Sequence, residues 1–520
     1  MTDERGHLDS PTADEERGPQ TEQDPQSEID PESLSMLPPE PASATVLSLP
    51  PTEERRPPTT AADLSVLDVR PTPGPPREYR FPAFERFRLG NGLTVISAHM
   101  PGRALLAANL LMPGGGAAEA AERAGVTVLT ARALTEGTRR LDAIAFVEAA
   151  ERLGAEIHAE TSWEALAATL EVPRSRFPAA LALLAEMVRQ PAFPASEVER
   201  LREERLNDLL QARADPRRRV ERVFPEAIYD PRSSYRRPLA GVEGTVGRLD
   251  RSAVVERHAE AGNAAAATLI VAGDLSGLDL PATVDEHLGD WPAGNDGRPS
   301  PTFVAAHPSA PRVVLVDRPG SPQSEVRIGH VGVPRKIPDF HAVSVLNAIV
   351  GGVFDARLNR VIREERGYTY AIWSTFEMRR AAGPFVVRTG VETGVTGPAI
   401  AETLAILRGM GEAEIEPREL TSVRDYLVGV FPLRFEAPPQ VAGALGGLVI
   451  NDLPDDELDR YRPQVAAVGA ADVLAAAQRH IRPAELSIVL VGDAAKVEPQ
   501  LRDIGHPPSV VLAADGNLDD

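Results

Sequence analysis

Two stretches of the chain, one in its middle and one near its C-terminal end, finish in the same way. An Arg-His pair at 257–258 is followed by the apolar run LIVAGDL, and an Arg-His pair at 479–480 is followed by IVLVGDA. Strand-like runs, helical segments and a hairpin precede both endings in the same order. Such a repeat predicts two tandem copies of one α+β unit, each with a sheet packed by helices. We assign the copies to residues 81–290 and 300–510.

The segment 1–80 has a different composition. It holds 15 Pro and 17 Asp or Glu against 7 Arg, and Tyr79 is its one aromatic residue. A segment of this kind cannot bury enough apolar surface to offset the entropy of ordering. We therefore predict a disordered, acidic, Pro-rich tail over 1–80, which carries nearly half of the net charge of −21.

The remaining composition excludes several classes of partner. A net charge of −21 disfavours nucleic acid and anionic lipid. No run of about 18 apolar residues occurs, so we expect no membrane span. The absence of cysteine excludes disulfides and thiolate metal sites. The N-terminal residues show no signal-peptide pattern, and we expect a cytoplasmic protein.

Local patterns predict the elements within both copies. Asn91-Gly92 between two alternating runs is typical of a hairpin turn. The segment 141–153 is predicted helical, with a stop at Gly154. We expect loops at 241–247 and at Gly351-Gly352. Further helices are predicted at 176–190, 197–213, 252–260, 341–350, 356–367, 398–410 and 417–430, and further strands at 104–113, 155–172, 267–275, 313–319, 324–333, 368–376, 384–392 and 486–492.

Residues 125–138, GVTVLTARALTEGT, carry apolar side chains at three- and four-residue spacing, which predicts a buried helix ending at Gly137. The segment resembles the signature helix of the M16 (pitrilysin/insulinase) metallopeptidases. In that family a Gly opens the segment, an inverted zinc motif H-x-x-E-H follows, and a Gly-Thr pair closes it. The two histidine positions here hold Val128 and Arg132, and the position of the general-base glutamate holds Ala131.

A zinc site on one helix needs histidines three or four residues apart. The chain has ten histidines, and even the closest two, His330 and His341, are too far apart for that spacing. His158 lies in a strand pattern and is expected to be an ordinary core or surface histidine. Where the M16 resemblance places a third ligand, a Glu, the nearest acidic residue is Asp208, for which a helix salt bridge is the alternative. We expect neither zinc nor any other cofactor on this chain.

The segment REERGYTY predicts a helix that carries Arg363 and stops at Gly367, followed by a strand that carries Tyr370. The two side chains can converge there and offer donors to a carbonyl or an oxyanion. An Arg-Glu pair and a Tyr on a sheet face are the alternative. The longer run GGVFDARLNRVIREERGYTY is similar to the M16 pattern that starts with a Gly-Gly pair. The resemblance implies substrate contacts by Arg363 and Tyr370 and a role for Gly351 and Gly352.

The resemblance covers about residues 84–497 and implies a non-catalytic partner subunit of a heterodimeric, M16B-type zinc endopeptidase. A zinc-binding M16 subunit would hold the metal, and Arg363 and Tyr370 would contact short or unfolded peptides. A metal-free homodimeric scaffold that binds peptides by strand addition is the alternative. An autonomous peptidase with an unrecognised site is the third hypothesis.

Overall fold

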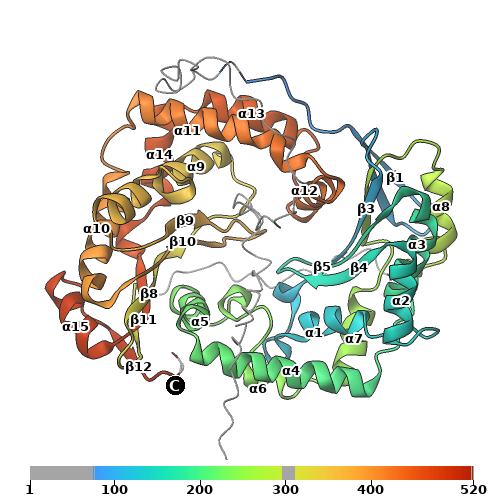
Figure 1. The fold of residues 1–520 in the computed structure, drawn as a ribbon, viewed down its shortest axis with the longest axis horizontal. Coiled ribbons are helices and arrows are strands. Elements are labelled where there is room, and N and C mark those ends of the chain that lie inside the picture. The colour runs from blue at the N-terminus through green and yellow to red at the C-terminus, as the bar shows by residue number, and fades with distance from the viewer. Residues whose placement is uncertain (1–73, 75, 295–310, 517, 519–520) are drawn as a thin grey trace, which may run out of the picture. The chain divides into compact units, whose positions relative to one another are not determined.

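The computed structural model describes residues 74, 76–294, 311–516 and 518 (Figure 1). Its strands form two six-stranded sheets, with the orders β1-β2-β6-β3-β5-β4 and β12-β7-β11-β8-β10-β9. The first sheet contains β1 (Phe84–Arg88), β2 (Thr94–His99), β3 (Leu105–Pro113), β4 (Glu156–Thr161), β5 (Ala165–Pro173) and β6 (Thr268–Gly273). The second contains β7 (Val313–Asp317), β8 (Gln323–Val331), β9 (Ile372–Phe376), β10 (Pro384–Glu392), β11 (Ser487–Gly492) and β12 (Val510–Leu512).

We call residues 76–294 the N-terminal half and residues 311–516 the C-terminal half. The N-terminal half has η3 (Gly116–Ala118), η4 (Ala121–Arg123), α1 (Val126–Leu134), α2 (Ala143–Leu153), η5 (Arg174–Arg176), α3 (Phe177–Arg189), α4 (Ala195–Ala214), α5 (Pro216–Ile228), η6 (Ser234–Arg236), α6 (Glu243–Val246), α7 (Arg251–Ala261) and α8 (Leu280–Leu288). The C-terminal half has α9 (Phe340–Asn347), η7 (Ala348–Gly352), η8 (Asn359–Glu365), η9 (Thr393–Val395), α10 (Thr396–Gly409), α11 (Pro417–Val430), η10 (Phe431–Phe435), α12 (Pro438–Ile450), α13 (Glu457–Ala467), α14 (Ala470–His480), η11 (Pro483–Glu485) and α15 (Ala494–Asp503).

The two sheets repeat one topology. In the first sheet β6 runs parallel to β2 and antiparallel to β3, and the hairpin β4–β5 continues the sheet. In the second sheet β11 runs parallel to β7 and antiparallel to β8, and the hairpin β9–β10 continues it. The runs LIVAGDL and IVLVGDA supply the equivalent interior strands β6 and β11. The predicted repeat is therefore confirmed, and the sheets differ at one edge, where β1 is antiparallel and β12 is parallel to its neighbour.

Local sequence signals account for several element boundaries. The hairpin β1–β2 turns at Asn91-Gly92, where Gly92 has a φ of +90°. Asp142 caps α2 by accepting a hydrogen bond from the amide of Ala145 at 2.8 Å. Gly154 ends the same helix with a φ of +63°. The predicted turn and the predicted helix boundaries are confirmed, and each of them depends only on residues close together in the chain.

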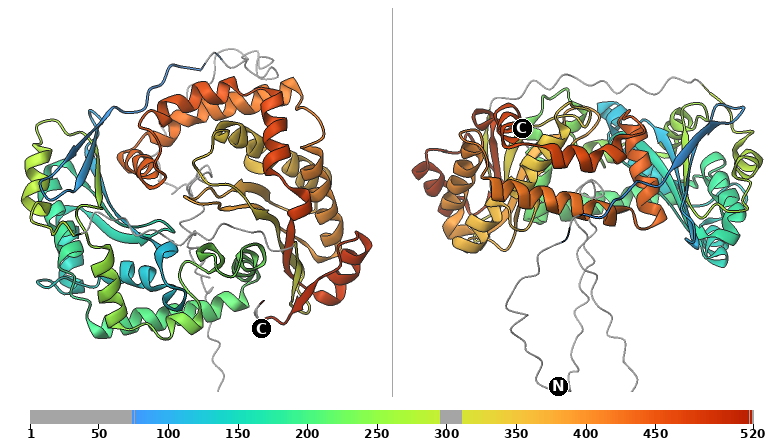
Figure 2. Two further views of the ribbon diagram at one scale, coloured as in Figure 1. Left: turned by 180° about the vertical axis from the view of Figure 1, so that it is seen from behind. Right: turned by 90° about the horizontal axis from the view of Figure 1, so that it is seen from above.

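Two helices are exchanged between the halves. Helix α5 of the N-terminal half packs against β8 and β11, and α12 of the C-terminal half packs against β3 and β6 (Figure 2). On α5, Val220, Val223 and Phe224 share one helical face and are buried with Val386 and Val489 of the second sheet. Neither helix was predicted from the sequence. Because each sheet needs a helix from the other copy to cover one face, the copies at 81–290 and 300–510 do not have separate cores.

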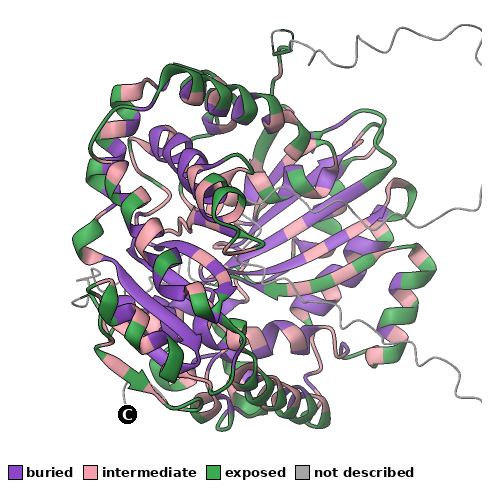
Figure 3. Ribbon diagram, turned by 60° about the vertical axis from the view of Figure 1, so that its left-hand side comes forward, coloured by how far each residue is buried: buried purple, intermediate pink, exposed green. Residues whose placement is uncertain are grey.

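The opposite faces of the sheets are covered from within each half. Helices α1, α2, α3, α7 and α8 bury one face of the first sheet. Figure 1 shows α9, α10 and α14 on the side of the second sheet away from α5. Both sheets therefore lie between helical layers, and Figure 3 shows their interior strands buried while the helices keep exposed outer faces.

The part of the chain that packs against the fold begins before residue 80, the boundary predicted from composition. The ring of Tyr79 meets the ring of Phe431 at 6.2 Å, and the amide of Phe81 donates to Asp459 at 2.9 Å. The carbonyl of Arg77 accepts a hydrogen bond from Arg462 at 2.9 Å. The prediction of a disordered tail up to residue 80 is thus wrong for its last residues, while its remainder, 1–73, lies outside the described residues.

Smaller differences concern other helices. The expected loop at 241–247 contains the short helix α6, and α8, α13, α14 and α15 were not predicted. Among the residues that the structure describes, no helix is both long and apolar enough to cross a bilayer.

Candidate functional site

Helix α1 carries the positions of the inverted zinc motif. It begins after Gly125, whose φ is +95° and where a Cβ would lie 2.8 Å from the carbonyl oxygen of Ala240. Glu119 caps it by accepting hydrogen bonds from the amides of Gly125 at 2.9 Å and Thr127 at 2.6 Å. Burial raises the pKa of Glu119, although these bonds oppose the shift. The helix ends at Leu134, before the predicted stop at Gly137.

Of the three motif positions on α1, Arg132 is the one that contacts α4. Ala131 is buried, while Val128 and Arg132, one turn apart, are half-buried. The guanidinium of Arg132 donates to Glu204 on α4 at 2.8 Å. Although partial burial alone would raise the pKa of Glu204, its hydrogen bonds with Arg200 and Arg132 lower it. The acidic residue that meets Arg132 is therefore Glu204.

Asp208, the expected stand-in for the third ligand, lies one turn further along α4. It is half-buried, and its charge acts on the nearby guanidinium of Arg205. This environment agrees with an ordinary charged helix residue.

These residues do not fit a zinc ion. The side chain of Val128 has no donor atom, and the guanidinium of Arg132 is a permanent cation that repels a metal. Across the described residues, no group of three or more His, Asp or Glu side chains is arranged to hold a metal ion. The charged network around Glu204 extends the α1–α4 contact, because Arg200, which also pairs with Glu204, donates to Glu136 at 2.7 Å and to Glu197 at 2.7 Å.

The Gly-Gly pair of the second motif ends a π-helical segment and is not the expected loop. Gly351 is buried against β9, and a Cβ there would lie 2.6 Å from the amide nitrogen of Ser374. A Cβ at Gly352 would lie 2.8 Å from the side-chain nitrogen of Asn347. Close packing therefore explains both glycines. No contact among the described residues points to a role for them in binding.

The two arginines of this motif have different surroundings. Arg357 is held by Glu419 through two hydrogen bonds, from Nε at 2.8 Å and from Nη2 at 2.7 Å. Arg363 lies on η8, and within the described parts of the chain its guanidinium has neither a hydrogen-bond nor an ion-pair partner. Its guanidinium carbon lies 4.6 Å from the ring centre of Phe354. Arg357 is thus committed to the fold, whereas the donors of Arg363 are available.

Tyr370 lies in the bend before β9, so its predicted place in a strand is wrong. Its side chain is largely in solvent, with an exposure of 92% for the residue. The hydroxyl of Thr369 lies 2.7 Å from the carbonyl oxygen of Gly390 and accepts a hydrogen bond from the amide of Ala371 at 3.1 Å. The first bond holds the chain before Tyr370 against β10, the second closes the turn around Tyr370, and the phenol stays outside.

The structure does not bring Arg363 into contact with Tyr370: in the described residues no hydrogen bond or ring contact joins them. It places both at one corner, between the π-helical segment η8 and β9. Single-turn π-helical insertions occur often at functional sites. Phe354 and Thr369 were not predicted from the sequence. The one sequence signal for Phe354 was its position, as an aromatic residue between the Gly-Gly pair and Arg357 of the motif.

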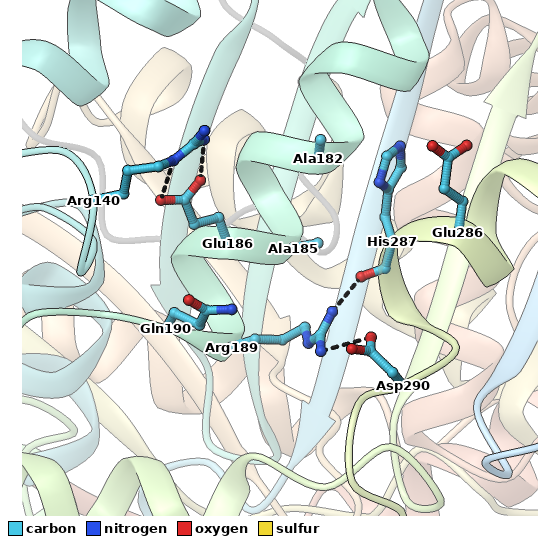
Figure 4. A pocket seen from close by; sticks show the side chains of 9 residues that line it. All are labelled: Arg140, Ala182, Ala185, Glu186, Arg189, Gln190, Glu286, His287 and Asp290. Carbon is cyan, nitrogen blue, oxygen red and sulfur yellow. Dashed lines mark hydrogen bonds and ion pairs between the residues drawn. The ribbon is translucent and has the colours of Figure 1, made fainter.

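A polar hollow of about 330 Å³ lies elsewhere, on the N-terminal half between α3 and α8 (Figure 4). The carboxylate of Glu186 accepts hydrogen bonds from Arg140, and Arg189 pairs with Asp290 at 2.6 Å. Arg189 also donates to the carbonyl oxygen of His287 at 2.6 Å. No predicted site residue lines this hollow, and both of its guanidinium groups already have carboxylate partners.

Two family models match the chain. Residues 94–240 match Insulinase (Peptidase family M16), and residues 248–427 match the Peptidase M16 inactive domain. The chain belongs to peptidase family M16. The expected family is therefore confirmed, and the two matched regions together span most of both sheets.

Relatives in this family carry different names. The chain is similar to the non-peptidase homolog YmxG of Helicobacter pylori, with 23% identity over 63% of this chain and 75% of the relative. It is similar to an uncharacterised zinc protease of Mycobacterium tuberculosis, with 23% identity over 78% of this chain and 92% of that relative.

Two solved structures share the fold. The M16 inactive domain from Pseudomonas fluorescens gives a TM-score of 0.72 at 23% identity, over 79% of this chain and 98% of that one. A protease from Helicobacter pylori gives a TM-score of 0.74 at 17% identity, over 79% of this chain and 100% of that one.

Proposed function

We propose that this M16 chain is the metal-free subunit of a two-chain zinc endopeptidase of the M16B type, in the cytoplasm. Its partner would be an M16 chain that carries H-x-x-E-H and so supplies both zinc and general base. This chain would supply Arg363 and Tyr370 to short or unfolded peptides. The names of two similar proteins, a non-peptidase homolog and an inactive domain, support a non-catalytic role.

The contrast between Arg357 and Arg363 carries the proposal. Both belong to one motif, yet Arg357 is bound by Glu419 and the side chain of Arg363 has no polar partner among the described residues. A guanidinium without a partner loses no internal bond when it turns toward a peptide carbonyl or an oxyanion. The exposed phenol of Tyr370 offers a second donor at the same corner.

The test is co-expression with the zinc-bearing M16 chain of the same genome. The purified pair is assayed with a short internally quenched peptide. Arg363→Ala and Tyr370→Phe should each lower kcat/KM by about 10²- to 10³-fold, the usual cost of one lost oxyanion donor. Arg360→Ala and Tyr368→Phe are the matched controls, because these residues flank the same corner, and they should retain activity.

Full activity of both site variants would contradict the proposal. So would a loss of the same size in the two controls, since it would indicate general damage to the fold.

The alternative is a metal-free homodimer that binds peptides without cleaving them. It is supported by the strand orders, in which β4 and β9 each end a sheet and can pair with an added strand. Purification as a tight homodimer that captures no M16 partner, together with binding of an unstructured peptide, would favour it over the two-chain enzyme.

A further inference from the structure

Phe354 lies in the connection between the two π-helical segments η7 and η8, and the guanidinium of Arg363 lies over its ring. The ring is unusually open for an aromatic residue, with 63% of the residue exposed. A packing role in the core therefore does not explain a phenylalanine at this position.

The guanidinium carbon of Arg363 lies over the ring of Phe354, at 4.6 Å from its centre. The attraction is between the positive charge and the electron-rich face of the ring. Because the ring has no lone-pair acceptor, this contact leaves the N–H donors without a conventional hydrogen-bond partner. Arg357 shows the opposite arrangement, in which two nitrogens are committed to Glu419.

We propose that Phe354 is a positioning residue that holds Arg363 by this stack and leaves its donors aimed at the peptide. The inference rests on the proposed function, in which Arg363 contacts the peptide. A free arginine samples many rotamers, and this freedom is lost when it binds. A ring that restricts the side chain beforehand reduces that loss, so the benefit appears in the same kinetic parameter that Arg363 itself controls.

The experiment is a double-mutant cycle in the co-purified pair. Phe354→Leu keeps an apolar side chain without an aromatic face, and Phe354→Tyr keeps the face. With the quenched peptide, Phe354→Leu should lower kcat/KM by about three- to tenfold. The loss should appear in whichever of kcat and KM is changed by Arg363→Ala. Phe354→Tyr should restore activity to within about twofold. In the Arg363→Ala background, Phe354→Leu should have no further effect.

Three results would overturn the inference: wild-type activity of Phe354→Leu, failure of Phe354→Tyr to restore activity, or an undiminished loss in the Arg363→Ala background. The last result would show that the ring acts independently of Arg363. Failure of the proposed function is distinguishable, because Arg363→Ala would then be fully active by itself.

The isolated chain gives a second readout that needs no partner. The indole introduced by Phe354→Trp should have different fluorescence with and without Arg363→Ala, because the guanidinium covers one of its faces. The same difference should be absent with Arg360→Ala. Identical emission in all three variants would contradict the stack in solution.

Discussion

The α1–α4 contact and the corner between η8 and β9 both keep the framework of their M16 motifs, but they use charge differently. At the first, Arg132 is paired with Glu204, and Arg200 with Glu136 and Glu197. At the second, the side chain of Arg363 has no polar partner within the described chain, and Tyr370 is exposed. A charge that is satisfied internally stabilises the fold and is unavailable to a ligand.

The two motifs therefore differ in what their side chains can still do in this chain. One helix retains its packing while its motif positions hold side chains that cannot bind a metal. The other corner retains donors that do nothing for the fold. Side chains with internal partners should therefore matter for stability, and those without should matter for peptides.

The largest expected effect is a gain of metal at the α1–α4 contact. The double variant Val128→His and Arg132→His places two imidazoles one turn apart and removes one of the two guanidinium groups that pair with Glu204, the other being that of Arg200. We expect about one zinc per chain with a micromolar dissociation constant, equivalent to about 8 kcal/mol. Metal analysis after dialysis measures it.

The matched variants identify the third ligand of that engineered site. Adding Glu204→Gln should abolish zinc binding, whereas adding Asp208→Asn should leave it, because Glu204 is the carboxylate that faces Arg132. The reverse outcome would show that Asp208 is the equivalent position.

The next largest effect is on stability, and it concerns an ion pair that joins the N-terminal half to the C-terminal half. Glu221 of α5 accepts hydrogen bonds from Arg327 at 2.7 Å and from Arg388 at 3.1 Å. Glu221→Gln should lower the free energy of unfolding by about 2 kcal/mol. This is less than the ~3–5 kcal/mol for a fully buried pair, because solvent reaches Glu221 and Arg327 keeps Glu325 as a partner. Urea unfolding measures it.

The same pair predicts a pH dependence. Burial alone would raise the pKa of Glu221, but Arg327 and Arg388 outweigh it and hold that pKa at about 2. Because this folded-state pKa is below the unfolded value, the stabilisation is complete above the unfolded pKa and is lost as pH falls toward 2. Stability of Glu221→Gln should therefore fall less steeply across this acid range than that of the wild type.

Arg357 and Arg363 give a direct contrast in stability. Arg357→Ala should destabilise the chain by about 1–2 kcal/mol, because it leaves the half-buried Glu419 without its two hydrogen bonds. Arg363→Ala should change stability by less than about 0.5 kcal/mol. Urea unfolding of both variants measures the difference. Equal losses would remove the distinction between committed and free arginines.

The smallest effect is expected for the ion pair between Arg132 and Glu204, at the positions of the zinc motif. Because the side chains of Arg132 and Glu204 remain 39% and 42% exposed, Arg132→Ala should cost at most about 0.5 kcal/mol. High salt should reduce even this difference. A loss several times larger in thermal or urea unfolding would mean that this pair does more than replace lost ligands.

Sequence was sufficient where neighbouring residues decide the structure. The Asn91-Gly92 turn and the caps of α2 by Asp142 and Gly154 follow from local chemistry. The interior strands β6 and β11 followed from the repeat. The M16 family followed from motifs in the right order.

Sequence was insufficient where distant residues decide. Helices α5 and α12 are stabilised by sheets of the opposite half, so their own segments carry little sign of where they pack. The strand pattern that includes Tyr370 is interrupted because Thr369 hydrogen-bonds to Gly390 on the neighbouring strand. The stack of Phe354 on Arg363 depends on a π-helical turn that no spacing rule anticipates.

The most direct test is a peptide-cleavage assay of the isolated chain, run with added zinc and with a chelator. We predict no zinc-dependent turnover by this chain alone, and turnover that appears when the zinc-bearing partner is added. Chelator-sensitive cleavage by the isolated chain, free of other peptidases, would contradict this prediction.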